Sequence, residues 1–333
     1  MPRPTYTNSG WGVHKINLRS DYMLQKDRFL TKYKRFDVDG NTYASYKRTL
    51  EKLYNNFGLY DGEDFRSITS DNIEDWLEDM TKDYKKSSLN LYIEHLAEFF
   101  NYLQKKDLVE KNPMKAIRRF GEKEVNDDAK NKYVATIEDI RKLLASTENR
   151  EKGERNFEFT SKRDKALLSF LIVSGCRQTI ARILTYDMME EIENGIAFNI
   201  GGEYTKSGKD QRIIIGNKAL EYLKDHIKNV EEKCIKSEYI FTSVKGKQLG
   251  AKEVRDIMDK ARRKAKLDTD GKQFSPHCLR NFLATYLVNK EVNPILIRTL
   301  LHWSQDKGDM LSRYATKDIK KYDKQIIDIT NIL

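Results

Sequence analysis

The apolar periodicity of this chain breaks near its middle, and that break limits the possible folds more than any other feature. Residues 119–132 carry many charges and no regular apolar spacing, whereas apolar side chains recur at helical steps before and after them. A chain of 333 residues also exceeds what one hydrophobic core usually serves. The sequence therefore predicts two domains, 21–118 and 133–333, joined by a linker at 119–132 and preceded by a loose arm at 1–20.

The two expected domains differ in their patterns. The strongest helical stripe lies in the first and consists of Leu89, Tyr92, Ile93, Leu96, Phe99, Phe100 and Leu103. In the second domain the pattern changes over 191–216, where Ile196, Phe198 and Ile200 alternate with other residues before helical spacing returns. We expect a mainly α-helical fold, all-helical in the first domain, with a small antiparallel β-sheet in the second.

Charge and composition narrow the class of protein. There are 61 Lys and Arg residues against 51 Asp and Glu, and the resulting net charge of +10 favours a polyanionic partner. No apolar run reaches the length of a membrane span, and no secretory signal is visible. Three scattered cysteines without a CxxC pair argue against disulfides and structural zinc. We expect a soluble, reduced, cytoplasmic protein with no metal and no cofactor.

Several cations stand where they can bind a phosphate. Arg177 follows Ser174-Gly175-Cys176, where a buried helix is expected to end. His277 and Arg280 lie three residues apart at the start of another expected helix, beside backbone N–H groups that favour anions. The planar fork of arginine donates two parallel hydrogen bonds to phosphate. Taken singly, however, each of these residues is most simply an ordinary surface or salt-bridge residue.

Further candidates lie on a turn and near the C-terminus. Lys206, on an expected hairpin turn, can reach into a cleft and donate a proton. Tyr314 has a hydroxyl group that can attack phosphorus and store a phosphodiester covalently. Gly201-Gly202 has no GK[ST] sequence in register, so nucleotide hydrolysis at a P-loop gains no support.

The order of these residues resembles that of one known family. In chain order they are Arg177, Lys206, His277, Arg280, Trp303 and Tyr314. With their flanks they resemble the tyrosine recombinases, the family of phage-type integrases and Xer-like recombinases. The segments that carry the resemblance are Ser174-Gly175-Cys176-Arg177, Thr205-Lys206, Pro276-His277-Cys278-Leu279-Arg280, Leu300-Leu301-His302-Trp303-Ser304 and Arg313-Tyr314-Ala315.

The resemblance implies a site-specific recombinase or integrase, with a helical core-binding domain and a catalytic domain. It would cleave and rejoin DNA strands through a 3′-phosphotyrosine at Tyr314, without ATP or metal. Arg177 and Arg280 would bind the non-bridging phosphate oxygens. His277 would accept the tyrosine proton or hydrogen-bond the phosphate, and Lys206 would protonate the leaving 5′-oxygen.

The sequence departs from the family pattern in three places. Ile180 stands where the family usually has an acidic residue, and His302 stands where it has glycine. Trp303 occupies the family's His or Trp position and would donate its indole N–H to the phosphate. The distance of 11 residues from Trp303 to Tyr314 is about two longer than is common, and Tyr322 is the alternative nucleophile.

The resemblance also suggests which molecules this chain binds. Double-stranded DNA would be held between the two domains, by a homo-oligomer that is a dimer on each site and a tetramer in the synapse, with room for a DNA-bending accessory protein. The candidates for phosphate contacts, each equally well a solvated surface residue, are Lys47, Arg48, Lys82, Lys85, Lys86, Arg255, Arg262, Arg263 and Lys264.

Three questions stay open at this level. The C-terminal tail at 315–333 has apolar residues at helical steps, and packs either on its own domain or on a neighbouring protomer. A type IB topoisomerase uses similar chemistry to relax supercoiled DNA. A catalytically inactive DNA-binding accessory factor is the third reading, because Ile180 and the longer segment before Tyr314 depart from the family pattern.

Overall fold

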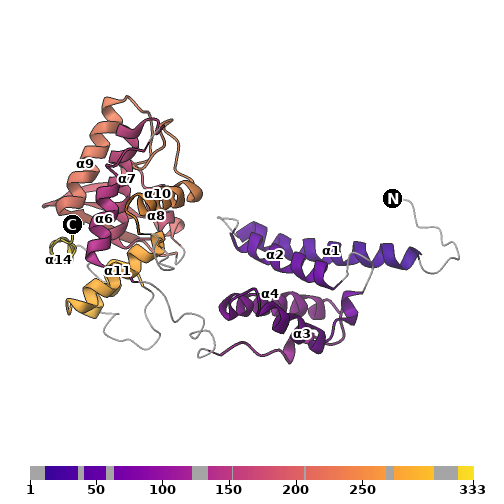
Figure 1. Cartoon of the computed structure of the whole chain (residues 1–333). Helices are drawn as coiled ribbons and strands as arrows, with labels where there is room; N and C mark the ends of the chain where they lie inside the picture. Colours follow the sequence, from indigo (N-terminus) through magenta and orange to yellow (C-terminus); the bar gives the residue numbers. More distant parts are fainter. Residues whose placement is uncertain are drawn as a thin grey trace. The chain divides into compact units, whose positions relative to one another are not determined.

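The chain folds into two compact units, Met1–Asn131 and Lys132–Leu333, shown in Figure 1. The structure is a computed structural model, and it describes residues 12–36, 41–57, 64–121, 134–151, 153–205, 208–267, 274–303 and 322–333. Within these ranges, no helix combines the length and the apolar character needed to cross a membrane.

The first unit is a bundle of helices around an aromatic core. Its helices are α1 (Gly12–Phe36), α2 (Asn41–Asn56), α3 (Ser70–Met80) and α4 (Lys86–Lys105), with 3-10 turns at Phe65–Ser67 and Pro113–Lys115. Tyr22, Phe29 and Phe99 are buried, and the ring of Phe99 meets those of Tyr22 and Phe29 edge to face. The Tyr22 hydroxyl donates to the Leu50 carbonyl oxygen at 2.8 Å, which ties α1 to α2. The expected all-helical first domain is confirmed in the described residues.

Helix α1 begins earlier than the sequence analysis expected. Residues 12–20 belong to the helix, whereas we expected 1–20 to be a loose arm. The segment Gly12–Phe36 contains no proline and no internal glycine, so its backbone can stay helical without an apolar stripe. Apolar periodicity marks which helix face is buried, and it therefore missed the helical turns before Tyr22.

The second unit combines a three-stranded sheet with a larger set of helices. The helices are α6 (Ile137–Ser146), α7 (Phe157–Ser174), α8 (Gln178–Ile183), α9 (Asn217–Glu232), α10 (Ala251–Lys264), α11 (Pro276–Asn289), α12 (Pro294–Leu301) and α14 (Asp323–Ile329). The strands are β1 (Met189–Ile192), β2 (Gly195–Ile200) and β3 (Gln211–Gly216), and 3-10 turns lie at Tyr186–Met188 and Gly202–Tyr204.

The sheet is an antiparallel meander in the order β1-β2-β3. Phe198 on β2 pairs with Met189 on β1 and with Ile213 on β3. The mainly α-helical class with a small antiparallel sheet in the second unit is thereby confirmed. Strand β1 was not expected as a separate strand, because its Met-Glu-Glu-Ile sequence shows no clear alternation.

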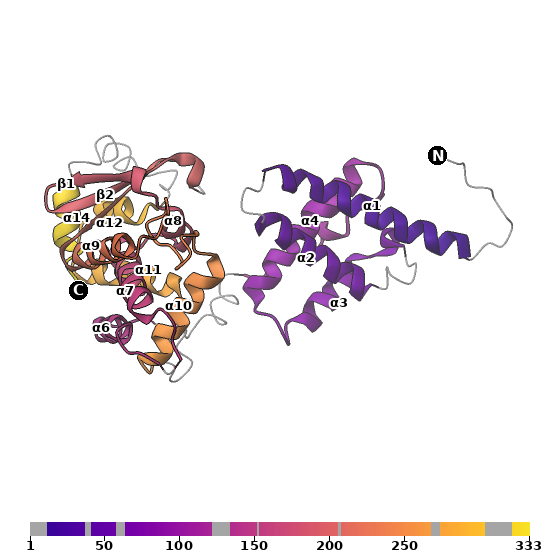
Figure 2. The same cartoon turned by 90° about the horizontal axis from the view of Figure 1, so that it is seen from above.

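Helix α7 is the centre of the second unit. It packs against α9, α11 and β3, and its residues from Ala166 to Ser174 are all buried. A helix that is apolar on every side must be surrounded, which Figure 2 shows for α7. The end of α7 is therefore a fixed point from which the next residues can be positioned.

The described part of the C-terminal tail packs on its own unit. Ile326 and Ile327 of α14, and Ile332 after it, are buried in the same core as the sheet. Gly216 on β3 lies so close to Ile327 that an added Cβ would be 2.8 Å from its side chain. Of the two packing alternatives, the structure places residues 322–333 on their own unit, while residues 315–321 lie outside the described residues.

Candidate active site

The candidate site starts where α7 ends. Gly175 caps this helix in the left-handed conformation, with φ at 56°. A Cβ at Gly175 would lie 2.5 Å from Leu301 Cδ2 and 2.9 Å from Leu283 Cδ2. Only glycine adopts this turn freely and leaves room for such a close approach. The turn brings α7 against α11 and α12, and it leads directly into Arg177.

Arg280 joins the three segments that meet here. Ser275 caps α11 by accepting from the Cys278 N–H, and Arg280 follows in the first turns of the helix. Its guanidinium is buried, donating from Nη1 to the Gly175 carbonyl oxygen at 2.6 Å and from Nη2 to the Leu301 carbonyl oxygen. These bonds orient the guanidinium and satisfy two carbonyl groups at helix ends.

Arg177 and Arg280 form a cationic pair. Burial lowers the pKa of Arg280, and the positive charge of the nearby Arg177 lowers it further. Arg177 is exposed at the start of α8. Within the described residues, neither arginine has an ion pair with a carboxylate. Two guanidinium charges that influence each other, and that lack an acidic partner in the described residues, favour a nearby anion.

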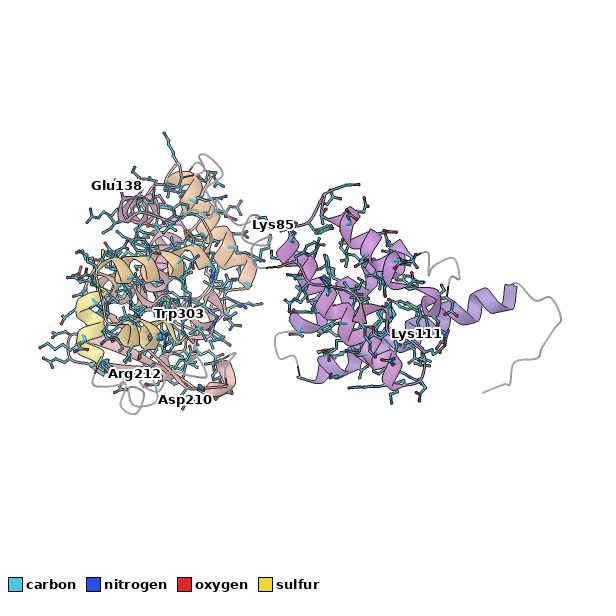
Figure 3. All side chains as sticks on the ribbon, turned by 90° about the horizontal axis from the view of Figure 1, so that it is seen from below. Lys85, Lys111, Glu138, Asp210, Arg212 and Trp303 are labelled. Carbon is cyan, nitrogen blue, oxygen red and sulfur yellow. The ribbon has the colours of Figure 1, made fainter. Side chains whose placement is uncertain are left out.

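The end of α12 borders this pair. His302 caps the helix, and burial together with the charges of Arg280 and Arg177 lowers its pKa to about 4, so its imidazole is neutral at physiological pH. Trp303 follows and is 45% exposed; it is labelled in Figure 3. The structure thus brings the His302 position to the arginines and leaves Trp303 accessible to a ligand.

The other expected site residues fall into two groups. His277 is exposed in the first turn of α11, one turn before Arg280. Lys206 and Tyr314 lie outside the described residues, so their roles stay predictions. Tyr322, the alternative nucleophile, is half-buried against the core of the second unit at the start of α14.

Cys176 and the histidines do not form an alternative site in the described ranges. Burial raises the pKa of the Cys176 thiol to about 11, so it is not a thiolate at neutral pH. Ile180, at the position where the family has an acid, is 4% exposed and packs in the core. No group of three His, Cys, Asp or Glu residues suited to a metal ion occurs among the residues described.

The expected DNA-contact residues of the first unit lie on its surface or close to it. Arg48 and Lys85 are exposed and have no ion pair within the described ranges; Figure 3 labels Lys85, at the start of α4. Lys47 and Lys82 each pair with an acidic residue one turn away in the chain. Lys86 is half-buried. Exposed pairs of this kind are weak and exchange readily for a phosphate.

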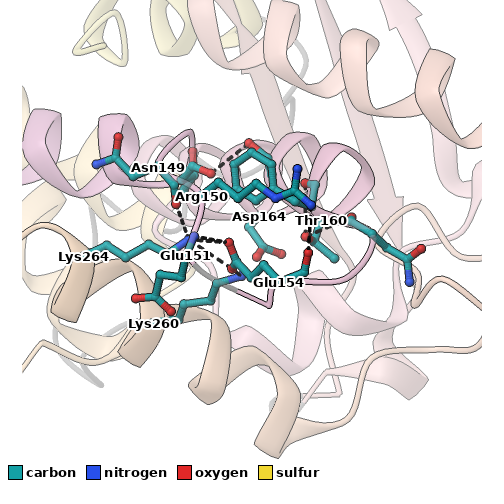
Figure 4. Close-up of polar contacts among 12 residues, drawn as sticks. Asn149, Arg150, Glu151, Glu154, Thr160, Asp164, Lys260 and Lys264 are labelled. Atoms are coloured by element: carbon teal, nitrogen blue, oxygen red, sulfur yellow. Dashed lines mark hydrogen bonds and ion pairs between the residues drawn. The ribbon is translucent and has the colours of Figure 1, made fainter.

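The expected DNA-contact residues on α10 differ more strongly from one another in exposure and in acidic partners. Arg255 is exposed, Arg262 is half-buried beside an acidic residue at 3.5 Å, and Arg263 pairs with Glu151 at 3.1 Å. The Lys264 side chain is only 4% exposed, and its Nζ lies 3.0 Å from Glu154 Oε2. The phosphate contact expected at Lys264 stays a prediction, and in this structure the ammonium group is enclosed by intramolecular partners (Figure 4).

Arg212 is a buried arginine that the sequence patterns did not single out. It is buried on β3 and donates to Glu190 at 2.5 Å, to Asn199 at 2.7 Å and to Asp323 at 2.8 Å. Its position within an apolar strand, Gln211–Gly216, was the available signal, since a buried arginine requires partners. It fastens α14 to the sheet.

This arrangement agrees with two family profiles. That of the Phage integrase family matches residues 133–321, and that of the phage integrase N-terminal SAM-like domain matches residues 30–107. The chain therefore belongs to the phage integrase family, and as a member it is a tyrosine-type recombinase.

Individual relatives agree with this assignment. A tyrosine recombinase of Agathobacter rectalis is 25% identical over 268 residues, covering 79% of this chain and 82% of the relative. The tyrosine recombinase XerC of Thermodesulfovibrio yellowstonii is 27% identical over 295 residues, covering 85% and 89%.

Solved structures share the fold. XerH recombinase bound to a palindromic difH substrate has a TM-score of 0.68 at 17% identity, with 92% of this chain and 95% of that chain covered. A lambda integrase tetramer bound to a Holliday junction has a TM-score of 0.64 at 17% identity, with 92% and 85% covered.

Proposed function

We propose that this chain is a site-specific recombinase that cuts and rejoins double-stranded DNA through a 3′-phosphotyrosine at Tyr314. The observation that carries the proposal is that the buried guanidinium of Arg280 is bonded to Gly175 at the end of α7, two residues before Arg177, and that neither arginine has a carboxylate partner in the described residues. Such a pair stabilises the negative charge that gathers on the non-bridging oxygens in the transition state.

The reaction exchanges one phosphodiester for another. The Tyr314 oxygen bonds to phosphorus, the bond from phosphorus to the 5′-oxygen breaks, and Lys206 supplies the proton to that oxygen. His277 accepts the tyrosine proton or hydrogen-bonds the phosphate, and Trp303 donates its indole N–H to it. A 5′-hydroxyl of a second strand then reverses the step. Because the phosphotyrosine conserves the bond energy, the cycle needs neither ATP nor metal.

The two units would act together on the duplex. The domains at 21–118 and 133–333, joined through 119–132, would clamp the DNA, with exposed cations such as Arg48, Lys85 and Arg255 on its phosphates. The related structures are a DNA-bound recombinase and a tetramer on a Holliday junction. By analogy, this chain would act as a dimer on each site and as a tetramer in the synapse.

A nicked suicide duplex tests the proposal. Cleavage close to the nick releases a short oligonucleotide, so the covalent protein–DNA adduct cannot rejoin and accumulates. We expect an adduct with the native chain, no adduct with Tyr314→Phe, and unchanged trapping with Tyr322→Phe as the matched control. Mass spectrometry of the adduct then identifies the tyrosine, and a modified Tyr322 would overturn the assignment.

Two further outcomes distinguish the alternatives. DNA binding without any trapped adduct would indicate a catalytically inactive accessory factor. Relaxation of supercoiled plasmid by a monomer, with no exchange between two sites, would indicate a type IB topoisomerase. The match to the integrase N-terminal domain favours the recombinase over the topoisomerase.

A further inference from the structure

His302 occupies a backbone position that favours glycine. As the residue that ends α12, it has φ at 48° and ψ at 44°, in the left-handed region. Its backbone N–H donates to the Thr299 carbonyl oxygen at 3.2 Å, so the backbone itself makes the capping bond. The imidazole ring is therefore not needed to end the helix.

The ring also leaves a polar atom unsatisfied. Nε2 of His302 is buried and has no hydrogen-bond partner within the described part of the chain. A buried polar atom without a partner costs free energy, so it calls for a functional reason. A phosphate oxygen would satisfy it.

The groups around His302 point to an anion. The ring is close enough to Arg280 and Arg177 for both charges to lower its pKa, in addition to the effect of burial. Arg280 also donates to the carbonyl oxygen of Leu301, the residue directly before His302. Because Ile180 is apolar and buried, it supplies no acidic partner to this cluster.

We propose that Nε2–H of His302 donates a hydrogen bond to a non-bridging oxygen of the phosphate bound between Arg177 and Arg280. His302 is then a phosphate-binding residue in addition to those that the family resemblance implies. The inference rests on the proposed function, since it requires a scissile phosphate at the arginine pair. A neutral imidazole serves this role because it donates one hydrogen bond without adding a third cation to the pair.

The test compares His302→Gly with His302→Gln. Glycine suits the left-handed backbone and removes the ring, whereas glutamine keeps an N–H donor, its Nε2, at about the position of the histidine Nε2. On the suicide duplex we expect His302→Gly to form the adduct at least 10-fold more slowly, and His302→Gln to stay within about fivefold of the native rate. Duplex affinity and thermal stability serve as controls, and affinity should stay within about threefold.

A modified DNA substrate distinguishes a direct contact between His302 and the phosphate from a purely structural role of the ring. In a methylphosphonate duplex, a methyl group replaces one non-bridging oxygen of the scissile phosphate. If His302 contacts that oxygen, the rate ratio of native to His302→Gly falls below about threefold for one of the two diastereomers. An unchanged ratio for both diastereomers overturns the inference, because the ring would then act only through structure.

The adduct assay also distinguishes a failure of the proposed function from a failure of the role proposed for His302. If the native chain forms no adduct, the proposed function fails, and the inference fails with it. If the native chain forms the adduct and His302→Gly forms it equally fast, the inference alone is overturned.

Discussion

The guanidinium of Arg280 donates a hydrogen bond of 2.6 Å to the carbonyl oxygen of Gly175, across 105 positions of the chain. This bond joins the end of α7 to α11, and the second bond of Arg280, to Leu301, adds α12. One side chain thus holds together the segments that carry the cationic site. Arg177 is exposed two residues after Gly175, and its side chain makes no comparable bond within the described residues.

Replacement of the two arginines should therefore have different consequences. Arg177→Ala should slow adduct formation by about 10²–10³-fold with little change in the free energy of unfolding. Arg280→Ala should slow it at least as much and also destabilise the fold by about 1–3 kcal/mol, because two buried carbonyl groups lose their donor. Suicide-substrate kinetics and urea denaturation measure the two effects. Equal stability of the two variants would contradict the structural role of Arg280.

Substitution of Gly175 should be more damaging than that of another left-handed glycine. In Gly175→Ala the new Cβ meets Leu301 and Leu283, in addition to the backbone strain at φ 56°. Gly153→Ala is the matched control, since its φ is 83° and no atom lies within 4 Å of the added Cβ. We expect about 1 kcal/mol of destabilisation for the control and at least about 2 kcal/mol for Gly175→Ala. Thermal or urea denaturation of both variants checks the difference.

The cluster around Glu154 should make the second unit sensitive to acid. Burial alone would raise the pKa of Glu154, but hydrogen bonds from Lys260, from the Glu151 N–H and from Lys264 lower it to about 2 (Figure 4). A depressed carboxyl pKa stabilises the fold above its unfolded value, near 4.5, and this stabilisation disappears as the pH falls towards 2.

Glu154→Gln should remove that part of the pH dependence. The variant should be less stable than the native chain at pH 7, and the difference should shrink as the pH falls from about 5 to about 2. Urea midpoints measured across this range provide the test. The exposed Glu158→Gln serves as a control, and a constant difference between Glu154→Gln and the native chain would refute the assignment.

The pairing of Arg212 with Asp323 should hold the C-terminal helix against the sheet. Hydrogen bonds from Arg212 to Asp323 and Glu190 raise the pKa of the guanidinium, so the pair stays charged. Asp323→Asn should accelerate amide hydrogen exchange at Ile326 and Ile327 by about 10-fold, because the buried Arg212 loses the one of its two carboxylate partners that lies on α14. Asp328→Asn, on an exposed residue of the same helix, should leave the exchange unchanged. Equal protection in both variants would show that apolar packing alone holds α14.

Much of this protein follows from local sequence patterns. Helical stripes report which faces are buried, so the all-helical first unit could be predicted, as could the buried helix before Gly175. The ordered set from Arg177 to Tyr314 identified the family without coordinates. The first turns of α1 and strand β1 were not predicted, because apolar residues are not regularly spaced in these segments.

What only the tertiary structure decided was the partner of each charged group. Lys264 and Arg255 lie on the same helix and look alike in the sequence, yet one is enclosed by Glu154 and the other is exposed. Arg280 is anchored by carbonyl groups far away in the chain, and the half-buried His302 directly follows one of them, Leu301. A side chain's residue type and helical position are local properties, whereas its burial and its counter-charges come from segments brought together only by packing.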